Sequence, residues 1–155
     1  MKTSVDVHNV LSEKNIPHEV VPLSRAVTST REMAAALNLS LSEVIKSILF
    51  IADGKPMLII LSGDKRVCYK KLRKALKISN LRLATREEVV DFTGYMLGAT
   101  PPLAHKVSLC TVMDANLRTQ NVVYTSAGEF NVVLKIRTLD LEKAVCAQGF
   151  DLTGD

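Results

Sequence analysis

Two apolar segments rich in β-branched residues, at 44–51 and 56–61, flank the dipeptide Asp53-Gly54. A two-residue type I′ turn needs a positive φ at both central positions, and Asp-Gly is one of its preferred sequences. The pattern therefore predicts a β-hairpin near the middle of the chain. This hairpin is the feature that most constrains the fold, because the other elements have to be arranged around it.

Helices and strands are predicted on both sides of the hairpin. Ser29 with Glu32, and Thr85 with Glu88, have the spacing of capping boxes, which open helices. Apolar residues at helical or alternating spacing indicate the remaining elements. The predicted helices span 5–15, 29–37, 68–76, 85–94 and 139–147. The predicted strands outside the hairpin span 18–23, 81–84, 107–113, 121–126 and 131–136.

The order of these elements indicates the fold class. There are roughly seven strands and five helices, and helices and hairpins are mixed rather than strictly alternating. A doubly wound fold would need strict alternation of strand and helix. We therefore expect an α+β fold with a mixed, barrel-like β-sheet and flanking helices.

Length and composition are those of one ordinary globular domain. The chain has 155 residues, which suits a single domain spanning 1–155, with 47% hydrophobic and 23% charged residues. The longest apolar run, at 48–52, is far too short to span a membrane. The polar, mixed segment 1–10 does not resemble a signal peptide. We therefore expect a cytoplasmic protein with no membrane partner.

Cysteine and histidine usage gives no sign of a metal centre. The three cysteines, Cys68, Cys110 and Cys146, stand far apart without a C-x-x-C pair, and the three histidines are also scattered. This pattern suggests neither a disulfide framework nor a zinc site, and we interpret the cysteines as small core residues. The sequence predicts no metal and no cofactor. The net charge of +4 is compatible with a phosphate-bearing partner.

Lys46 stands inside the apolar run 44–50. On a strand it would share one face with Val44, Ile48 and Phe50, because side chains alternate between the two faces. A charge on such a face is costly unless it reaches water or an anion. Two interpretations stay open: the ammonium group reaches water past an edge strand, or it binds an anionic ligand.

The segment 94–102 carries two glycines four positions apart and then two prolines. Such a loop is stiff, and its glycines let backbone groups approach a ligand closely. Its N–H groups could hold a carbonyl oxygen or a phosphate. The alternative is a surface crossover between a helix and a strand. The candidate residues of this loop are Gly94, Tyr95, Gly98, Ala99, Thr100, Pro101 and Pro102.

The tripeptide Ser126-Ala127-Gly128 ends a predicted strand. It lacks the G-x-S-x-G frame of a nucleophile elbow, and no His or Asp stands in a recognisable relation to Ser126. A turn between two strands is the favoured interpretation.

The segment 65–77 carries seven basic residues and no acidic one. It could lie along a nucleic-acid backbone, where neutralised phosphates release counterions. The alternative is a solvated helix face. Tyr69 is the single aromatic residue of the segment, so a platform for base stacking is not indicated. The residues predicted to contact a nucleic acid are Lys65, Arg66, Lys70, Lys71, Arg73 and Lys74.

Taken in order, several motifs resemble the YbaK/prolyl-tRNA synthetase editing-domain family. The similarity covers about residues 5–147, and a synthetase catalytic or anticodon-binding portion is not recognised, so the chain resembles a stand-alone member. The order and spacing of the motifs are more specific than any one of them. The motifs span 44–50 with Lys46, 62–67 leading into 70–72, 83–84 with 87–89, 93–95 with Gly98 and Pro102, 123–128, and 138–141.

The resemblance implies an enzyme, an aminoacyl-tRNA deacylase that hydrolyses the ester of a wrong small amino acid on tRNA. The expected substrate is tRNA(Pro) carrying Ala or Cys, and the expected partners are aminoacyl-tRNA and prolyl-tRNA synthetase. A pocket rejects a near-isostere only about 10- to 200-fold, so a second, hydrolytic step is useful. Members are not thought to use a triad or a metal, and an activated ester can be hydrolysed through orientation and oxyanion stabilisation.

The resemblance also implies roles for the candidate residues. Lys46 would hold the terminal phosphate or adenosine, and backbone groups at 98–102 and 126–128 would bind the aminoacyl moiety while water attacks. The basic segment 65–77 would lie under the acceptor stem. The implied catalytic set is Lys46, Gly98, Pro102, Ser126 and Gly128. The implied substrate-binding set is Lys46, Gly94, Tyr95, Ala99, Thr100, Pro101, Ser126 and Ala127.

Some positions depart from the pattern of the family. Ala104 stands where Gly is common, Leu23 replaces an aromatic residue, and apolar Val133 lies where cysteinyl-tRNA-directed members carry polar groups. Cysteinyl specificity is therefore not carried over, and alanyl-tRNA(Pro) is at least as well supported. The departures leave open a non-catalytic tRNA- or synthetase-binding module on the same fold. A small-molecule hydrolase using Cys or Ser is disfavoured, because no His is suitably spaced.

Overall fold

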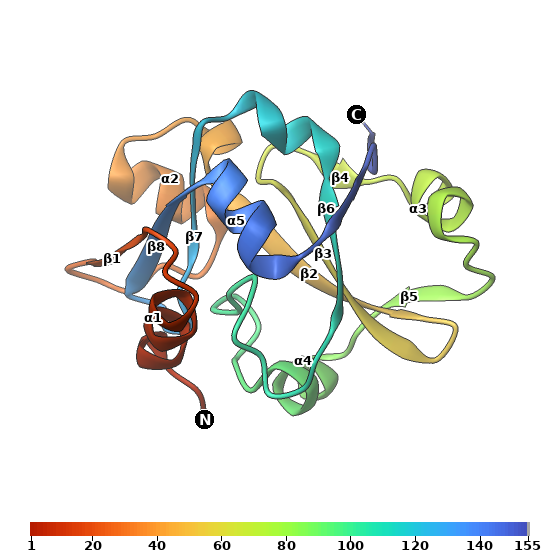
Figure 1. Ribbon diagram of the computed structural model, residues 1–155, viewed down its shortest axis with the longest axis horizontal. Helices are drawn as coiled ribbons and strands as arrows, with labels where there is room; N and C mark the ends of the chain where they lie inside the picture. Colours follow the sequence, from red (N-terminus) through yellow and green to blue (C-terminus); the bar gives the residue numbers. More distant parts are fainter. Residues whose placement is uncertain (155) are drawn as a thin grey trace.

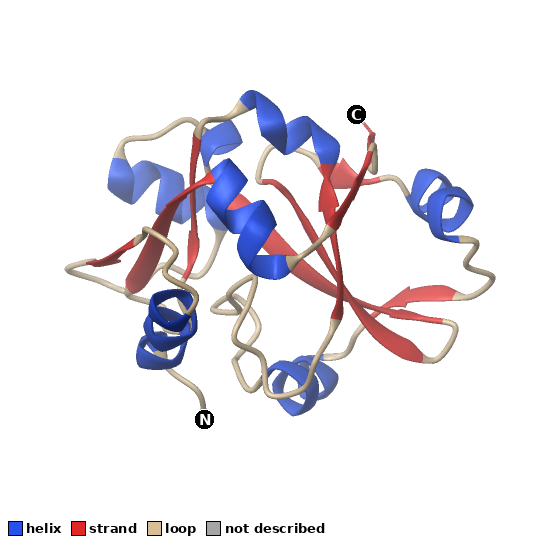
Figure 2. Ribbon diagram, in the orientation of Figure 1, coloured by secondary structure: helices blue, strands red, loops and turns tan. Residues whose placement is uncertain are grey.

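The computed structural model describes residues 1–154, and Figures 1 and 2 show twisted sheets with helices around them. The predicted hairpin lies at the centre, where β2 (Ile45–Ala52) pairs antiparallel with β3 (Lys55–Ser62). In the turn between them φ is 48° at Asp53 and 82° at Gly54. The predicted hairpin, with a positive φ at both turn positions, is confirmed.

The largest sheet has five strands in the order β5-β2-β3-β6-β9. β5 (Leu81–Leu83) pairs antiparallel with β2. On the other side, β6 (Cys110–Asp114) runs parallel to β3, and β9 (Gln148–Phe150) runs parallel to β6. The sheet is therefore mixed, and the carboxyl ends of β3, β6 and β9 lie at the same edge.

Two smaller sheets complete the fold. One has three antiparallel strands in the order β1-β8-β7, and an isolated parallel bridge between Val44 and Tyr124 attaches β7 to the start of β2. The other pairs β4 (Arg66–Val67) with β10 (Thr153–Gly154). Within residues 1–154 none of the three sheets closes into a barrel, and the predicted α+β fold with a mixed sheet is confirmed. The strands β1, β7 and β8 span Glu19–Pro22, Val122–Ser126 and Val132–Arg137.

Helices flank the sheets on several sides. Figure 1 shows α2 beside β7 and β8, and α3 at the opposite end of the molecule, next to β4 and β5. Every helix described in residues 1–154 is too short or too polar to cross a lipid bilayer. The five α-helices are α1 (Ser4–Glu13), α2 (Thr30–Leu37), α3 (Tyr69–Leu76), α4 (Arg86–Thr93) and α5 (Thr138–Val145). Two 3-10 helices are η1 (Leu41–Glu43) and η2 (Ala115–Thr119).

The central hairpin is buried on both faces. Ile45 and Leu58 face one apolar cluster, to which α1 and α5 also contribute. Phe50 and Ile59 face a second cluster, which Leu72 of α3 closes. Removing a large aliphatic side chain from water contributes about 1.5–3 kcal/mol, so a strand pair covered on both sides is a strong organising element. The hairpin therefore gives the Lys46 region a rigid support.

Several boundaries differ from the predictions for physical reasons. The strand predicted at 107–113 begins at Cys110, because the backbone N–H groups of Lys106 and Val107 are bonded to the end of α4 instead. The final helix ends at Val145, because Cys146 adopts a left-handed conformation with a φ of 50°. The strands β4, β9 and β10 have two or three residues each and were not predicted.

The three cysteines do not lie in the core as predicted. Cys110 and Cys146 are exposed, and Cys68 is only partly buried. Cys68 is the N-cap of α3, and Cys146 follows the last residue of α5. The positions of both cysteines are therefore set by the ends of helices and not by packing in the core.

Candidate functional site

A cavity of about 300 Å³ lies where four segments of the chain meet. They are the start of α2, the start of β2, the loop after α4 and the end of β7. From the predicted set the cavity is lined by Lys46, Gly98, Thr100 and Ser126. These residues are up to 80 positions apart in the sequence (Lys46 to Ser126), and the fold brings them to one place.

Lys46 lies on β2 opposite Leu61 of β3 and is partly buried. Its pKa is lowered from the ordinary lysine value, first by desolvation and then by the nearby Arg66, whereas Asp64 acts in the opposite direction. Among residues 1–154 no carboxylate lies within ion-pair distance of its Nζ. The cavity thus has a cationic group whose charge is available to an anionic ligand.

The loop after α4 lines the same cavity with Gly98 and Thr100. Gly98 has a φ of 93°, and a Cβ there would come within 3.3 Å of both Phe130 and the carbonyl oxygen of Thr28. Within residues 1–154 the backbone N–H groups of Gly98 and Thr100 have no hydrogen-bond partner. Free N–H groups beside a cation form a suitable environment for a carbonyl oxygen that gains negative charge.

The turn after β7 holds this loop in place. The hydroxyl of Ser126 donates to the carbonyl of Gly98 over 3.2 Å, and the N–H of Gly128 donates to the carbonyl of Ala99 over 3.0 Å. Gly128 has a φ of 97°, and a Cβ there would come within 2.8 Å of the Tyr95 ring. The two glycine-containing segments identified from the sequence, 94–102 and 126–128, therefore contact each other directly.

Other predicted residues lie behind or beside the cavity. Ala99, Ala127 and Tyr95 are buried and do not line the cavity, so they support the lining rather than form it. The Tyr95 hydroxyl donates to the carbonyl of Ala104 over 2.9 Å, and burial raises the pKa of this phenol. Ala104, where the family often has Gly, has a φ of 65°.

Gly94, Pro101 and Pro102 do not line this cavity. Gly94 caps α4 with a φ of 83°. The carbonyl of Pro101 bonds Nε2 of His105 over 2.8 Å, and burial lowers the pKa of that imidazole. A neutral His105 donates this bond and stiffens the loop. Pro102 lines a separate cavity beside Leu103 and Lys14.

Two contributions to the cavity were not predicted from the sequence. The first is the N-terminal end of α2, whose positive helix dipole favours anions; Ser29 caps this end by accepting from the Glu32 N–H over 3.1 Å. The second is Ser47, whose buried hydroxyl has no partner among residues 1–154. The Ser29 capping signal located the helix end, but no sequence signal placed it near Lys46.

The residues of the predicted basic segment lie in different local surroundings. Lys70, Arg73 and Lys74 are exposed on α3, at the other end of the molecule from α2 (Figure 1). Lys71 instead forms an ion pair with Asp151 at 3.0 Å and donates to the carbonyl of Thr153. Arg66 is exposed on β4 and is close enough to lower the pKa of Lys46. Lys65 lines a second cavity.

A family model described as an aminoacyl-tRNA editing domain matches residues 24–144, which include the whole Lys46 cavity. The chain belongs to this family. The resemblance to the YbaK/prolyl-tRNA synthetase editing domains found in the sequence is thereby confirmed.

Relatives of this editing domain include proline--tRNA ligases. The domain is 27% identical over 131 residues to the ligase of Lactobacillus acidophilus, covering 82% of this chain and 23% of the ligase. It is 35% identical over 108 residues to the ligase of Solidesulfovibrio magneticus, covering 68% of this chain and 18% of the ligase. The chain thus spans about a quarter or less of the ligases it matches.

A solved structure has the same fold over its whole length. It is described as a candidate trans-editing enzyme for prolyl tRNA synthetase, and it superposes with a TM-score of 0.91 at 25% identity. The match covers 100% of this chain and 99% of the other.

Proposed function

We propose that this editing domain hydrolyses the ester between a mischarged small amino acid and the 3′-terminal adenosine of tRNA. The preferred substrate in this proposal is tRNA(Pro) carrying Ala or Cys. The observation that carries it is the cavity lined by Lys46, Gly98 and Thr100. Among residues 1–154, Lys46 has no carboxylate partner, and the N–H groups of Gly98 and Thr100 have no hydrogen-bond partner. The family and the trans-editing neighbour support the same reaction.

Each group of the cavity has a role in this mechanism. The ammonium of Lys46 binds the terminal phosphate or the adenosine, and the N–H groups of Gly98 and Thr100 receive the ester carbonyl oxygen. Water attacks the carbonyl carbon, the bond to the ribose oxygen breaks, and that oxygen takes up a proton. Preorganised donors contribute most when negative charge develops on the carbonyl oxygen. The backbone at 126–128 holds the loop in position.

The lining of the cavity favours a small apolar side chain. Val27, Met33 and Ile45 contribute buried apolar surface, and the volume is about 300 Å³. Such a lining suits the methyl group of alanine. A thiol is accommodated at little cost, because a hydrophobic pocket discriminates weakly between near-isosteres. Alanine is therefore the first substrate to test and cysteine the second.

The tRNA body would be held by exposed basic residues. Arg66 lies nearest to Lys46, and Lys70, Arg73 and Lys74 extend the positive charge along α3. In this proposal residues 1–155 act as one domain in the cytoplasm, and prolyl-tRNA synthetase supplies the mischarged tRNA.

Deacylation of a small panel of charged tRNAs tests the proposal. The panel is Ala-, Cys-, Ser- and Thr-tRNA(Pro), with Pro-tRNA(Pro) as the correctly charged control. We expect one mischarged species to be hydrolysed by the wild type and not by Lys46→Ala. Hydrolysis of none of them, or equal hydrolysis by Lys46→Ala, contradicts the proposal.

The second candidate function is a non-catalytic tRNA- or synthetase-binding module. The departures of this chain from the family pattern at Ala104, Leu23 and Val133 favour it. Ala104 follows the loop at 94–102, and Leu23 and Val133 belong to or adjoin the β1-β8-β7 sheet. Binding of tRNA with a steep salt dependence, without turnover of any panel member, would identify this function.

A further inference from the structure

A second cavity, of about 390 Å³, lies at the edge where β3, β6 and β9 end. Ser62 is the last residue of β3, Asp114 is the last residue of β6, and Asp151 directly follows β9. Ligands of sheets with parallel strands bind outside the carboxyl ends of those strands. This cavity shares no lining residue with the Lys46 cavity.

The buried carboxylate of Asp114 is the main feature of this cavity. Asp114 is 1% exposed, and its Oδ1 accepts from the N–H of Leu152 at 3.1 Å and from Nδ2 of Asn116 at 3.2 Å. Its Oδ2 is buried and has no hydrogen-bond partner among residues 1–154. A buried carboxylate oxygen without a partner is costly, so a native protein rarely keeps one without a bound group to meet it.

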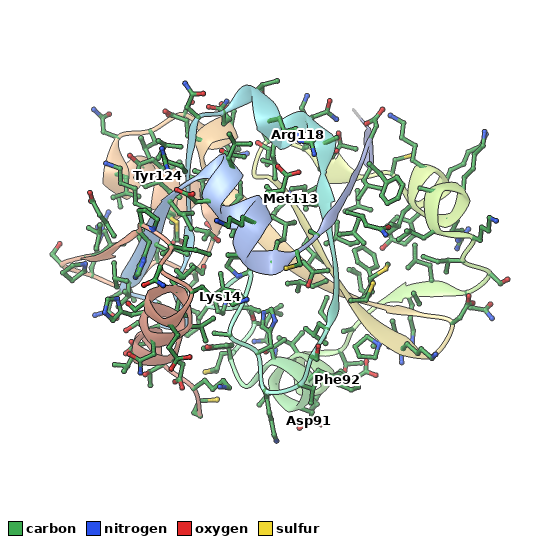
Figure 3. All side chains as sticks on the ribbon, viewed as in Figure 1. Lys14, Asp91, Phe92, Met113, Arg118 and Tyr124 are labelled. Carbon is green, nitrogen blue, oxygen red and sulfur yellow. The ribbon has the colours of Figure 1, made fainter. Side chains whose placement is uncertain are left out.

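Strand alternation explains why Asp114 faces this cavity. The preceding residue, Met113, points into the main apolar cluster beneath α5, as Figure 3 shows. The next residue of a strand points to the opposite face. There Asp114 meets η2 and the C-terminal segment, both of which line the cavity.

Carboxylates from three segments of the chain line this cavity. Asp64, Asp114 and Asp151 all line the cavity. Asp151 is neutralised by Lys71 at 3.0 Å, and Lys65 supplies one further positive charge to the lining. Neither Asp64 nor Asp114 forms an ion pair within residues 1–154. Asp64 Oδ1 accepts from the Ser62 hydroxyl, whereas Asp114 Oδ2 has no hydrogen-bond partner among the same residues.

We propose that this second cavity binds a small molecule that carries a primary ammonium group, with Asp114 Oδ2 as the acceptor. An ammonium group has three donors and no acceptor, and its bond to a carboxylate is charge-assisted. It supplies both the donor and the charge that Asp114 lacks. The volume also suits a small organic ligand. This site lies beyond the proposed deacylation, because it shares no lining residue with the Lys46 cavity.

Isothermal titration calorimetry with putrescine at low salt tests the site. We expect one saturable site for putrescine and none for 1,4-butanediol, which has the same length without charge, or for MgCl₂. Asp114→Asn keeps an acceptor for the Leu152 N–H but removes the charge, so it should weaken putrescine binding at least about 10-fold. Asp91→Asn, on α4 at the lower edge of Figure 3 and far from the labelled Arg118 of η2, should bind like the wild type.

A thermal melt of each variant separates lost binding from lost folding. If Asp114→Asn does not fold, Asp64→Asn replaces it, with an expected weakening of about 3-fold or more. No binding of putrescine, equal binding by the Asn variant, or equally tight binding of the diol or of Mg²⁺ overturns the proposal. Lys46→Ala should keep putrescine binding, so failure of this site and failure of the deacylase proposal are distinguishable.

Discussion

Lys46 and the lysines of α3 carry the same charge in different surroundings. Lys46 stands on a central strand, and desolvation lowers its pKa. Lys70 and Lys74 extend from the exposed side of α3 at the other end of the molecule. A desolvated charge costs folding free energy, whereas an exposed charge costs little. The location of a positive charge, more than the number of charges, therefore marks the candidate site.

The largest expected effect compares Lys46→Ala with Lys74→Ala. Loss of the partly buried ammonium should lower kcat/KM for the mischarged tRNA about 100-fold or more, as for other preorganised groups at a reaction centre. Loss of one exposed lysine should lower it only about 2- to 3-fold, mainly through KM. Steady-state deacylation of both variants measures this, with thermal melts to check folding. Equal losses of kcat/KM for the two variants would mean that the Lys46 cavity and α3 do not differ in their contribution to deacylation.

The next effect concerns the loop that faces Lys46. Gly98→Ala forces a non-glycine residue to a φ of 93° and pushes its Cβ against Phe130 and the Thr28 carbonyl. We expect kcat/KM to fall about 10- to 100-fold, because small displacements of positioning groups are costly. Gly54→Ala is the matched control, since its φ is 82° but nothing lies within 4 Å of the added Cβ.

Both glycine variants should lose about 1–2 kcal/mol of stability from the left-handed backbone. Urea unfolding measures that loss, and deacylation measures the activity. A similar loss of activity in Gly54→Ala would mean that global stability, and not the shape of the loop, limits turnover.

A smaller effect is expected at Ser47, whose buried hydroxyl has no hydrogen-bond partner among residues 1–154. If this hydroxyl bonds the substrate, Ser47→Ala should lower kcat/KM about 3- to 10-fold, the usual range for one hydrogen bond. The stability should not fall, because the variant removes an unpaired polar group. Ser108→Ala, at an exposed position, is the control for deacylation and melting. Unchanged kinetics together with raised stability would assign Ser47 to packing alone.

Local signals explain which parts of the fold were predictable. Asp53-Gly54 predicted the hairpin because the required backbone angles belong to the turn itself. Thr85 and Glu88 predicted α4 because the capping box is a contact between neighbours in the sequence. The strands β4, β9 and β10 exist through pairing with distant segments, so their own two or three residues carry no signal.

The candidate site was only partly predictable for the same reason. Lys46 was identifiable, since a charge inside an apolar run is unusual in any context. Ala99 and Thr100 are neighbours in one glycine-containing loop, yet Ala99 is buried behind the cavity and Thr100 lines it. That difference depends on the turn at 126–128, which lies far away in the sequence. The start of α2 was missed because its approach to β2 is a tertiary contact.

The smallest expected effect is on the stability of the protein without substrate. The pKa of Lys46 in the folded chain is lower than the ordinary value of 10.5, so between these two values the unfolded chain binds more protons. Stability from this group therefore rises with pH through that window, and at pH 7 the charged Lys46 is unfavourable.

Lys46→Met should raise Tm at pH 7 by about 1–3 °C, and this gain should shrink as the pH approaches 10.5. Lys74→Met, at an exposed position on α3, is the control for the effect of removing one lysine. A lower Tm for Lys46→Met at pH 7 would mean that the charge is stabilised within the protein itself. The ammonium of Lys46 would then not be free to bind a ligand, and Lys46 would not differ from the exposed lysines of α3 in the way argued above.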